Sequence, residues 1–457
     1  GPHVNAQMDP ADNPKAWQSL LRAVALAPKV TERERACIHA LESRYAENPP
    51  EDRRVLDEAY AKATEALVAQ RPADLDARVF HAEALMDLQP WDYYDEKLAP
   101  KGNTAAVVSL LESVMKENPN HAGALHLYVH AVEASADPQR GVVAADRLRT
   151  LIPGSGHLVH MPAHIYARVG RWHDAVVANQ AAIAADNDYL ATCGPNAKGV
   201  YPLGYVPHNP HFLWFAASME GASKVAQDAA RTTAQRVNLP DLMRQPGFAG
   251  LQHYWMTPWF DNVRFGRWDE IRAVPNPAPD LPYVTAIWNY AQAMAAIRQG
   301  RMEDANTHYA ALSKLAADPI MPTLMVWDRY PLAHAANIAE RTVNAELALA
   351  RGDQAAAIAA LAEAVTIEDR IPYDEPPGWH SPVRQSLGAA MLSAGRASEA
   401  EQVYRDELQR NPQNGWSLKG LALALRQQQQ TEAALAVEKQ LQAAWQHADV
   451  QLVASRF

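Results

Sequence analysis

A short turn element recurs along this chain of 457 residues and constrains its fold more than any other feature. Glycine followed by arginine and a helix-favouring segment occurs at Gly170, Gly266, Gly300 and Gly395, and the interval from Gly266 to Gly300 is 34 residues. Glycine readily takes the conformation that ends a helix. A fixed interval of this size is typical of stacked helical repeats. The pattern therefore predicts antiparallel helix pairs joined by tight turns.

The remaining local signals are helical throughout. Alternating β-branched runs are missing, while Ala, Leu, Glu, Gln and Arg dominate. Apolar helical stretches end at breaks such as Asn48-Pro49, Asn118-Pro119 and Asn411-Pro412, where proline cannot continue the hydrogen-bond ladder. We predict an all-α fold.

The segment from Ser381 to Asn414 carries small, aromatic and helix-breaking residues at repeat spacing: Leu387, Gly388, Gly395, Ala400, Tyr404 and Pro412. With these residues the chain resembles the tetratricopeptide-repeat (TPR) family. The resemblance implies a right-handed α-solenoid whose first helix in each pair lines a concave groove. We expect N-terminal repeats over 1–118, a His-rich region over 119–270 and C-terminal repeats over 271–457.

Composition narrows the function. The formal net charge is −10, from 42 Lys and Arg against 52 Asp and Glu, with no basic stripe, so nucleic acid is not an expected partner. No apolar run approaches the roughly 20 residues that span a bilayer. With only Cys37 and Cys193, any metal chemistry falls on His and carboxylate side chains.

Histidine pairs recur with the repeat. His126 and His130 reappear as His160 and His164 after 34 residues, and each pair has the i, i+4 spacing that places both rings on one helix face. Equivalent positions of stacked repeats lie side by side, so four imidazoles are expected to meet in the groove. His208 and His211 form a further pair that we expect to complete a dinuclear or expanded site. The alternative is a hydrogen-bonded polar seam between repeats.

The ligand types favour particular metals. Histidine without thiolate suits copper, iron or zinc. Three pairs would serve two metals and leave positions for dioxygen, which favours copper. His126, His130 and Glu133 could instead form a two-histidine, one-carboxylate iron site, and three His with water would suit hydrolytic zinc.

Two aromatic, proline-rich stretches interrupt the helical rhythm, at 188–210 and 371–382. They are expected either to cap the groove or to act as spacers. From this neighbourhood and the groove we expect Glu133 or Tyr166 to handle protons and His380 to join them in catalysis. Substrate contacts are expected from Arg168 and Arg384, which match a carboxylate, and from the aromatic side chains of Trp255 and Trp379.

A narrower resemblance rests on three segments. The helix His160-Met161-Pro162-Ala163-His164-Ile165-Tyr166, the segment 208–212 and the segment 376–384 are similar to a group of bacterial TPR proteins with HMPxHIY, HNxHF-like and PPGWHxPxR-like motifs. The resemblance implies a shared site but no particular reaction.

The leading hypothesis is thus a copper-favoured, dioxygen-dependent metalloenzyme acting on a small molecule or peptide-like substrate. The alternatives are a non-catalytic TPR scaffold, which would bind a protein partner through its TPR surface, and a zinc hydrolase. Gly1-Pro2-His3 resembles the remnant of a cleaved tag, so either a cytoplasmic or a periplasmic location is compatible with this start.

Overall fold

The computed structural model describes residues 2–5, 8–194, 199 and 201–457. These residues form two compact units, residues 1–153 (unit 1) and residues 154–457 (unit 2). The three-part division at 118 and 270 stays a prediction.

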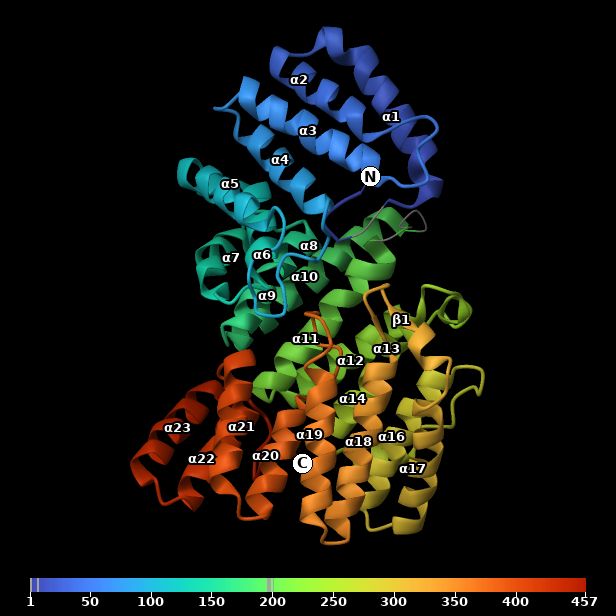
Figure 1. The fold of residues 1–457 in the computed structure, drawn as a ribbon, viewed down its shortest axis with the longest axis vertical. Coiled ribbons are helices and arrows are strands. Elements are labelled where there is room, and N and C mark those ends of the chain that lie inside the picture. The colour runs from blue at the N-terminus through green and yellow to red at the C-terminus, as the bar shows by residue number, and fades with distance from the viewer. Residues whose placement is uncertain (1, 6–7, 195–198, 200) are drawn as a thin grey trace. The chain divides into compact units, whose positions relative to one another are not determined.

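Unit 1 consists of helices that follow one another through short turns, as the labels of Figure 1 show. Its α-helices are α1 (Asn13–Leu26), α2 (Glu32–Leu41), α3 (Arg54–Gln70), α4 (Leu75–Asp87), α5 (Thr104–Glu117), α6 (Ala122–Val132) and α7 (Val142–Leu148). Successive helices pack on one another, as in the pairs α3–α4 and α5–α6.

Unit 2 continues with longer helix pairs. Its first helices are α8 (Gly156–His160), α9 (Pro162–Arg168), α10 (Trp172–Cys193), α11 (Val206–Glu220), α12 (Ser223–Arg236), α13 (Ala249–Trp255), α14 (Thr257–Arg264) and α15 (Trp268–Arg272). The later ones are α16 (Pro282–Arg298), α17 (Met302–Ala316), α18 (Ala333–Ala350), α19 (Gln354–Glu368), α20 (Val383–Ser393), α21 (Ala397–Arg410), α22 (Gly415–Gln427) and α23 (Thr431–Ala444).

The fold class is confirmed. Each unit is an array of antiparallel helix pairs, and the extended structure among the described residues is small. It includes β1 (Met325–Val326) and β2 (Tyr330–Pro331), which pair antiparallel with Val326 opposite Tyr330. No helix in the described part of the chain is both long and apolar enough to cross a bilayer.

The recurring glycines end helices as their spacing predicts. Gly170, Gly266, Gly300 and Gly395 have φ of 78°, 68°, 72° and 73° and lie in the turns α9–α10, α14–α15, α16–α17 and α20–α21. Residues with side chains avoid this left-handed region. Glycine therefore allows each chain reversal within very few residues.

The stretch 188–210 is more helical than its composition predicts. α10 extends to Cys193, a π-helical turn covers Tyr201–Tyr205, and α11 begins at Val206. The rest of the expected insert is therefore short, and residues 195–198 and 200 lie outside the described residues. Proline at the start of α11 is compatible with a helix because first-turn N–H groups have no helical acceptor. Residues 371–382, in contrast, contain no regular helix or strand, as expected.

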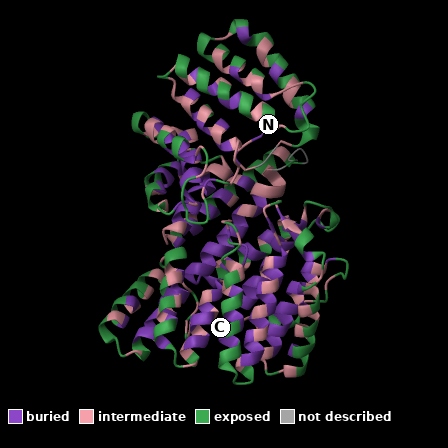
Figure 2. Ribbon diagram, in the orientation of Figure 1, coloured by how far each residue is buried: buried purple, intermediate pink, exposed green. Residues whose placement is uncertain are grey.

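The central helices of unit 2 are buried over most of their surface, notably α11, α16 and α18 (Figure 2). Polar side chains on these helices are therefore removed from bulk water and need partners within the protein.

Three helices of the last repeats pack closely around one aromatic side chain. Tyr404 of α21 is fully buried, and Gly388 of α20 and Gly420 of α22 face its ring. A Cβ atom at Gly388 or Gly420 would lie 2.4 or 2.2 Å from Tyr404 Cζ. The small residues thus let neighbouring helices close on the ring, in the roles that the repeat pattern predicts.

We expect Gly420→Ala to lower the free energy of unfolding by about 1–3 kcal/mol, because the methyl group overpacks a buried ring that cannot move aside. This cost exceeds the helix propensity that alanine gains over glycine, about 1 kcal/mol. Urea unfolding measures the difference. Gly154→Ala is the matched control, since a Cβ atom there has no neighbour within 4 Å. Equal stability of the Gly420 variant and the native chain would contradict the packing argument.

Candidate functional site

The predicted pair His160 and His164 lies on two short helices rather than one. α8 ends at His160, and α9 begins at Pro162, whose missing N–H interrupts the hydrogen-bond ladder. The i, i+4 relation survives the break, because the ring centroids are 4.6 Å apart and the two Nε2 atoms are 2.6 Å apart. The exposed fractions of His160 and His164 are 0% and 3%.

His208 of α11 joins this pair. Its Nε2 atom is 3.0 Å from Nε2 of His160. One ring nitrogen from each of His160, His164 and His208 lies within 4.8 Å of the others, an arrangement that could hold a metal ion. We call these three residues the histidine triad.

The triad is close to the geometry of a metal site. Two imidazole nitrogens on one tetrahedral ion, each about 2.0–2.1 Å from it, are roughly 3.3 Å apart. The Nε2 separations of 2.6 and 3.0 Å are slightly shorter. An ion would thus require the rings to part by less than about 1 Å.

The opposite nitrogens of two triad residues are oriented by polar partners. Nδ1 of His160 is 2.7 Å from Oδ1 of Asn179 on α10, and the Asn179 amide donates to Ala175 O at 2.8 Å. That donation identifies Oδ1 as the atom facing His160. Nδ1 of His164 pairs with the Glu375 carboxylate. An acceptor at Nδ1 places the ring proton there and turns the Nε2 lone pair toward the centre of the triad.

A cavity of about 190 Å³ borders the triad. His164, Phe212, Tyr373, Glu375 and Trp379 are among its lining residues. Much of its wall is the loop 371–382. The structure thus gives this loop a place beside the triad, while its role as a lid stays a prediction.

The cavity wall also carries two carboxyl groups, that of the buried Glu407 and that of the partly buried Glu368. Burial, reinforced by the charge of Glu407, raises the pKa of Glu368 to about 8. Burial likewise raises the pKa of Glu407 to about 7. Glu368 accepts from the Val383 N–H at 3.2 Å, and Glu407 accepts from Asn411 Nδ2 at 2.7 Å. At neutral pH this wall therefore holds protons that ordinary glutamates would have lost.

Of the predicted substrate contacts, Arg168, Arg384 and Trp379 line the cavity. Arg384 donates through Nη1 and Nη2 to Asp369 at 2.8 and 2.6 Å, so its bidentate edge already holds a carboxylate of the protein. Arg168 lies with its guanidinium carbon 5.6 Å from the centre of the Tyr373 ring. Trp255 is not among the lining residues and packs on Trp259, with ring centroids 5.4 Å apart.

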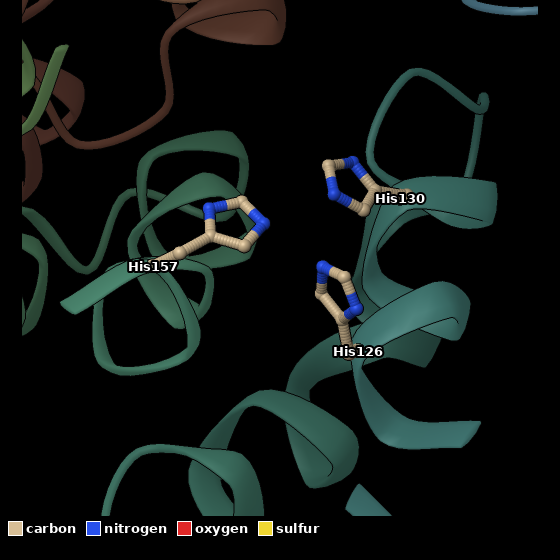
Figure 3. A group of neighbouring side chains, drawn as sticks. All are labelled: His126, His130 and His157. Atoms are coloured by element: carbon tan, nitrogen blue, oxygen red, sulfur yellow. The ribbon is translucent and has the colours of Figure 1, made fainter. Parts of the chain in front are cut away.

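The other predicted pair, His126 and His130, lies in unit 1. His126 and His130 project from the same face of α6, with ring centroids 4.9 Å apart, and Figure 3 shows both side chains. Nδ1 of His130 is 3.3 Å from Oε1 of Glu133, and both side chains are buried. This contact places Glu133 as an orienter of His130. The four-histidine site stays a prediction, because its halves lie in different units.

His211 lies apart from the triad, although it is three residues from His208. It is buried between aromatic rings, with centroid distances of 4.2 Å to Tyr254 and 5.4 Å to Trp214. Its ring centroid is 6.3 Å from that of His253. Burial lowers the pKa of His211 well below its usual value. Within unit 2, the group of nitrogens that could hold a metal thus includes His208 but not His211.

The remaining predicted catalytic residues also lie away from the triad nitrogens. Tyr166 follows His164 by two positions, about 200° around the helix. It is fully buried, with the Arg171 guanidinium carbon 4.3 Å from its ring centre. His380 lines a second cavity and has its Nε2 atom 3.1 Å from the Tyr290 hydroxyl.

Asn179 and Glu375 contact the triad, and the sequence analysis did not identify them. Asn179 is one polar residue in an Ala-rich helix, and nothing in the local pattern sets it apart. Glu375 directly precedes the Pro-Pro-Gly-Trp-His segment. Its carboxylate in that motif-bearing loop was the only sequence signal that could have linked it to a histidine.

Comparison with known proteins does not assign the chain to a family. No protein-family model and no curated protein sequence matches the chain. Among solved structures, the human IFIT1 dimer with m7Gppp-AAAA is 13% identical, with 95% of this chain and 87% of that chain covered and a TM-score of 0.38. The APC/C hetero-tetramer Cut9-Hcn1 is 9% identical (93% and 96% covered, TM-score 0.31), and the P58(IPK) TPR domain is 12% identical (91% and 99% covered, TM-score 0.23).

The raised pKa of Glu407 predicts a pH-dependent stability. Its pKa is about 7 in the folded protein against a usual 4.5, so the folded state loses stability as pH rises from about 4.5 to about 7. Glu407→Gln removes this loss. We expect the variant to gain at most about 3 kcal/mol over the native chain between about pH 5 and about pH 8.

Urea unfolding at the two pH values measures this gain. Glu432→Gln, at an exposed position of α23, is the control and should show the same pH dependence as the native chain. A stability difference between the Glu407 variant and the native chain that does not change with pH would disprove the prediction.

Proposed function

We propose that unit 2 binds one transition-metal ion through Nε2 of His160, His164 and His208, and that the protein is a metalloenzyme. The convergence of these three nitrogens beside a cavity is the observation that carries the proposal. Three histidines leave coordination positions open, which is the arrangement of catalytic rather than structural sites.

The hydrogen-bond partners of the triad favour a metal site over a purely hydrogen-bonded contact between repeats. A neutral imidazole has one donor and one acceptor nitrogen. His160 and His164 both direct Nδ1 to oxygen acceptors, so their Nε2 atoms are both acceptors. Two acceptor lone pairs 2.6 Å apart repel unless a positive centre lies between them. A proton shared by His160 and His164 would serve those two rings, whereas a bound cation serves all three rings that direct a nitrogen to the same point.

Copper is the metal that we propose. The triad offers only imidazole nitrogen, and imidazole suits copper, zinc and iron, while thiolate is absent from it. The Glu375–His164 pair is also an arrangement found around zinc. Zinc hydrolysis is therefore the second candidate. Metal content decides between them, since copper supports dioxygen-dependent oxidation and zinc does not change oxidation state.

The proposed substrate is a small molecule in the 190 Å³ cavity. Phe212, Tyr373 and Trp379 supply apolar wall, and Arg168 supplies positive charge. Glu368 and Glu407 in the cavity wall can exchange protons near neutral pH. A peptide-like substrate or a protein partner on the TPR surface stays an alternative.

We expect the native protein to bind one equivalent of copper and His160→Ala to bind none, because the variant removes the nitrogen that contacts both other rings. Elemental analysis after reconstitution and desalting measures this. His334→Ala is the matched control, since His334 lies on α18 outside the triad, and it should retain the metal.

Each outcome is decisive. One equivalent of zinc in natively purified protein, with no copper uptake, would favour the zinc hydrolase over the copper-dependent oxidase. No uptake of copper, zinc or iron by the native chain would contradict the metalloenzyme hypothesis and favour the TPR scaffold. Equal loss in both variants would show that the triad is not the site.

The orienting partners should tune affinity without being ligands. Glu375→Gln, which removes the charge of the acceptor, and Asn179→Leu, which removes the acceptor itself, are expected to weaken metal binding by about 10–100-fold, the usual effect of changing the partner behind a ligating histidine. Competition with a chromophoric chelator measures the dissociation constant. Glu363→Gln on the exposed surface of α19 is the control. Unchanged affinity in both orienting variants would show that the Nδ1 contacts do not set the ligand geometry.

A further inference from the structure

A second cavity in unit 2, of about 40 Å³, is lined by an unusual concentration of arginine. Arg264, Arg298 and Arg456 line it together with Tyr290 and His380. The histidine triad is not part of this lining. The cavity therefore calls for an explanation that does not depend on a metal.

Arg264 of α14 is the most deeply buried of these arginines, at 4% exposed. Its Nη1 atom donates to Gln385 Oε1 at 2.6 Å and to Ser381 Oγ at 2.5 Å. Its guanidinium carbon lies 3.9 Å from the centre of the Trp416 ring. Its Nε and Nη2 atoms have no hydrogen-bond acceptor among the described residues. These two N–H groups form one edge of the guanidinium.

His380 offers a third donor to the cavity. The Tyr290 hydroxyl is 3.1 Å from His380 Nε2, and burial lowers the pKa of His380 well below its usual value, so the ring is neutral. With the hydroxyl donating to Nε2, the ring proton is on Nδ1. Nδ1 also has no acceptor in the described part of the chain.

Positive charge exceeds negative charge around the cavity. Arg298 and Arg456 share one carboxylate, that of Glu346, and Arg298 Nη2 is 3.0 Å from it. Glu407 attracts Arg264 at longer range, but it lines the first cavity. Burial lowers the pKa of Arg264 to about 9. A buried guanidinium without full compensation is costly, and an anion would remove that cost.

We propose that this cavity binds the carboxylate group of a small organic anion, held by the Nε–Nη2 edge of Arg264 and by Nδ1 of His380. Two parallel N–H groups on a planar guanidinium match the two oxygens of a carboxylate. The volume accepts about three water-sized groups, which suits a carboxylate head. Arg298 and Arg456, with side chains 25% and 20% exposed, give the anion a cationic approach from solvent.

The test is thermal unfolding of the full chain in sodium formate, with sodium chloride keeping the ionic strength constant. A ligand that binds only the folded state stabilises it by RT ln(1 + [L]/Kd), so Tm begins to rise near Kd and then follows the logarithm of the ligand concentration. We expect this rise with formate in the native chain. In Arg264→Lys, which keeps the charge but loses the two-donor edge, the Kd for formate obtained from the rise should be roughly tenfold higher or more.

Arg244→Lys is the matched control, because Arg244 pairs with Asp280 on the surface, and it should respond to formate as the native chain does. If Arg264→Lys does not fold, His380→Phe serves instead and should raise the Kd for formate several-fold. A native chain that responds equally to formate and chloride would overturn the proposal, because the cavity would then show no preference for a carboxylate. An undiminished formate response in the folded Arg264 or His380 variant would overturn it as well.

Phosphate in a parallel series distinguishes a planar two-oxygen ligand from a tetrahedral one, and tighter binding of phosphate would contradict the carboxylate assignment.

Discussion

Loss of water around polar side chains is the constraint on which the sites of unit 2 depend. Helices such as α11 and α16 are covered by their neighbours on most sides, so an imidazole or guanidinium on them must find its partners inside the protein. His160 finds Asn179, and Arg264 finds Gln385. We propose ligands at the sites where the protein's own groups do not supply a complementary charge.

Two such sites differ in the sign of the charge that they would bind. In the histidine triad, the Nε2 atoms of His160 and His164 lie 2.6 Å apart, and the ligand that we propose is a cation. In the second cavity, two N–H groups of Arg264 have no acceptor among the described residues, and the ligand that we propose is an anion. One helical array thus provides opposite electrostatic environments. Each arises because the surrounding helices exclude the water that would otherwise solvate the group.

The loop 371–382 connects these two environments along the chain. Glu375 contacts His164 of the triad, and His380 lies in the cavity with Arg264. Trp379, between them in sequence, lines both cavities. A proline-rich loop suits this role because it has few conformations to lose on folding, so its side chains are held in place at low entropic cost.

The repeat architecture and part of the candidate site were predictable from the sequence. Turn glycines such as Gly266 and Gly300 required a left-handed conformation, and the i, i+4 spacing of His160 and His164 brought two rings together even though Pro162 divides their helix. These are local properties, determined within one or two helical turns.

The long-range partners were decided only by the tertiary structure. His208 reaches the triad while His211, three residues away, turns to Tyr254, and no local pattern distinguishes the two. Asn179 and Glu375 were missed because their roles depend on how α10 and the loop 371–382 pack around His160 and His164. The sequence by itself determined which residues could ligate a metal and where helices turn. Packing decided which nitrogens meet and which polar groups are left without water, because those distances join segments remote in the chain.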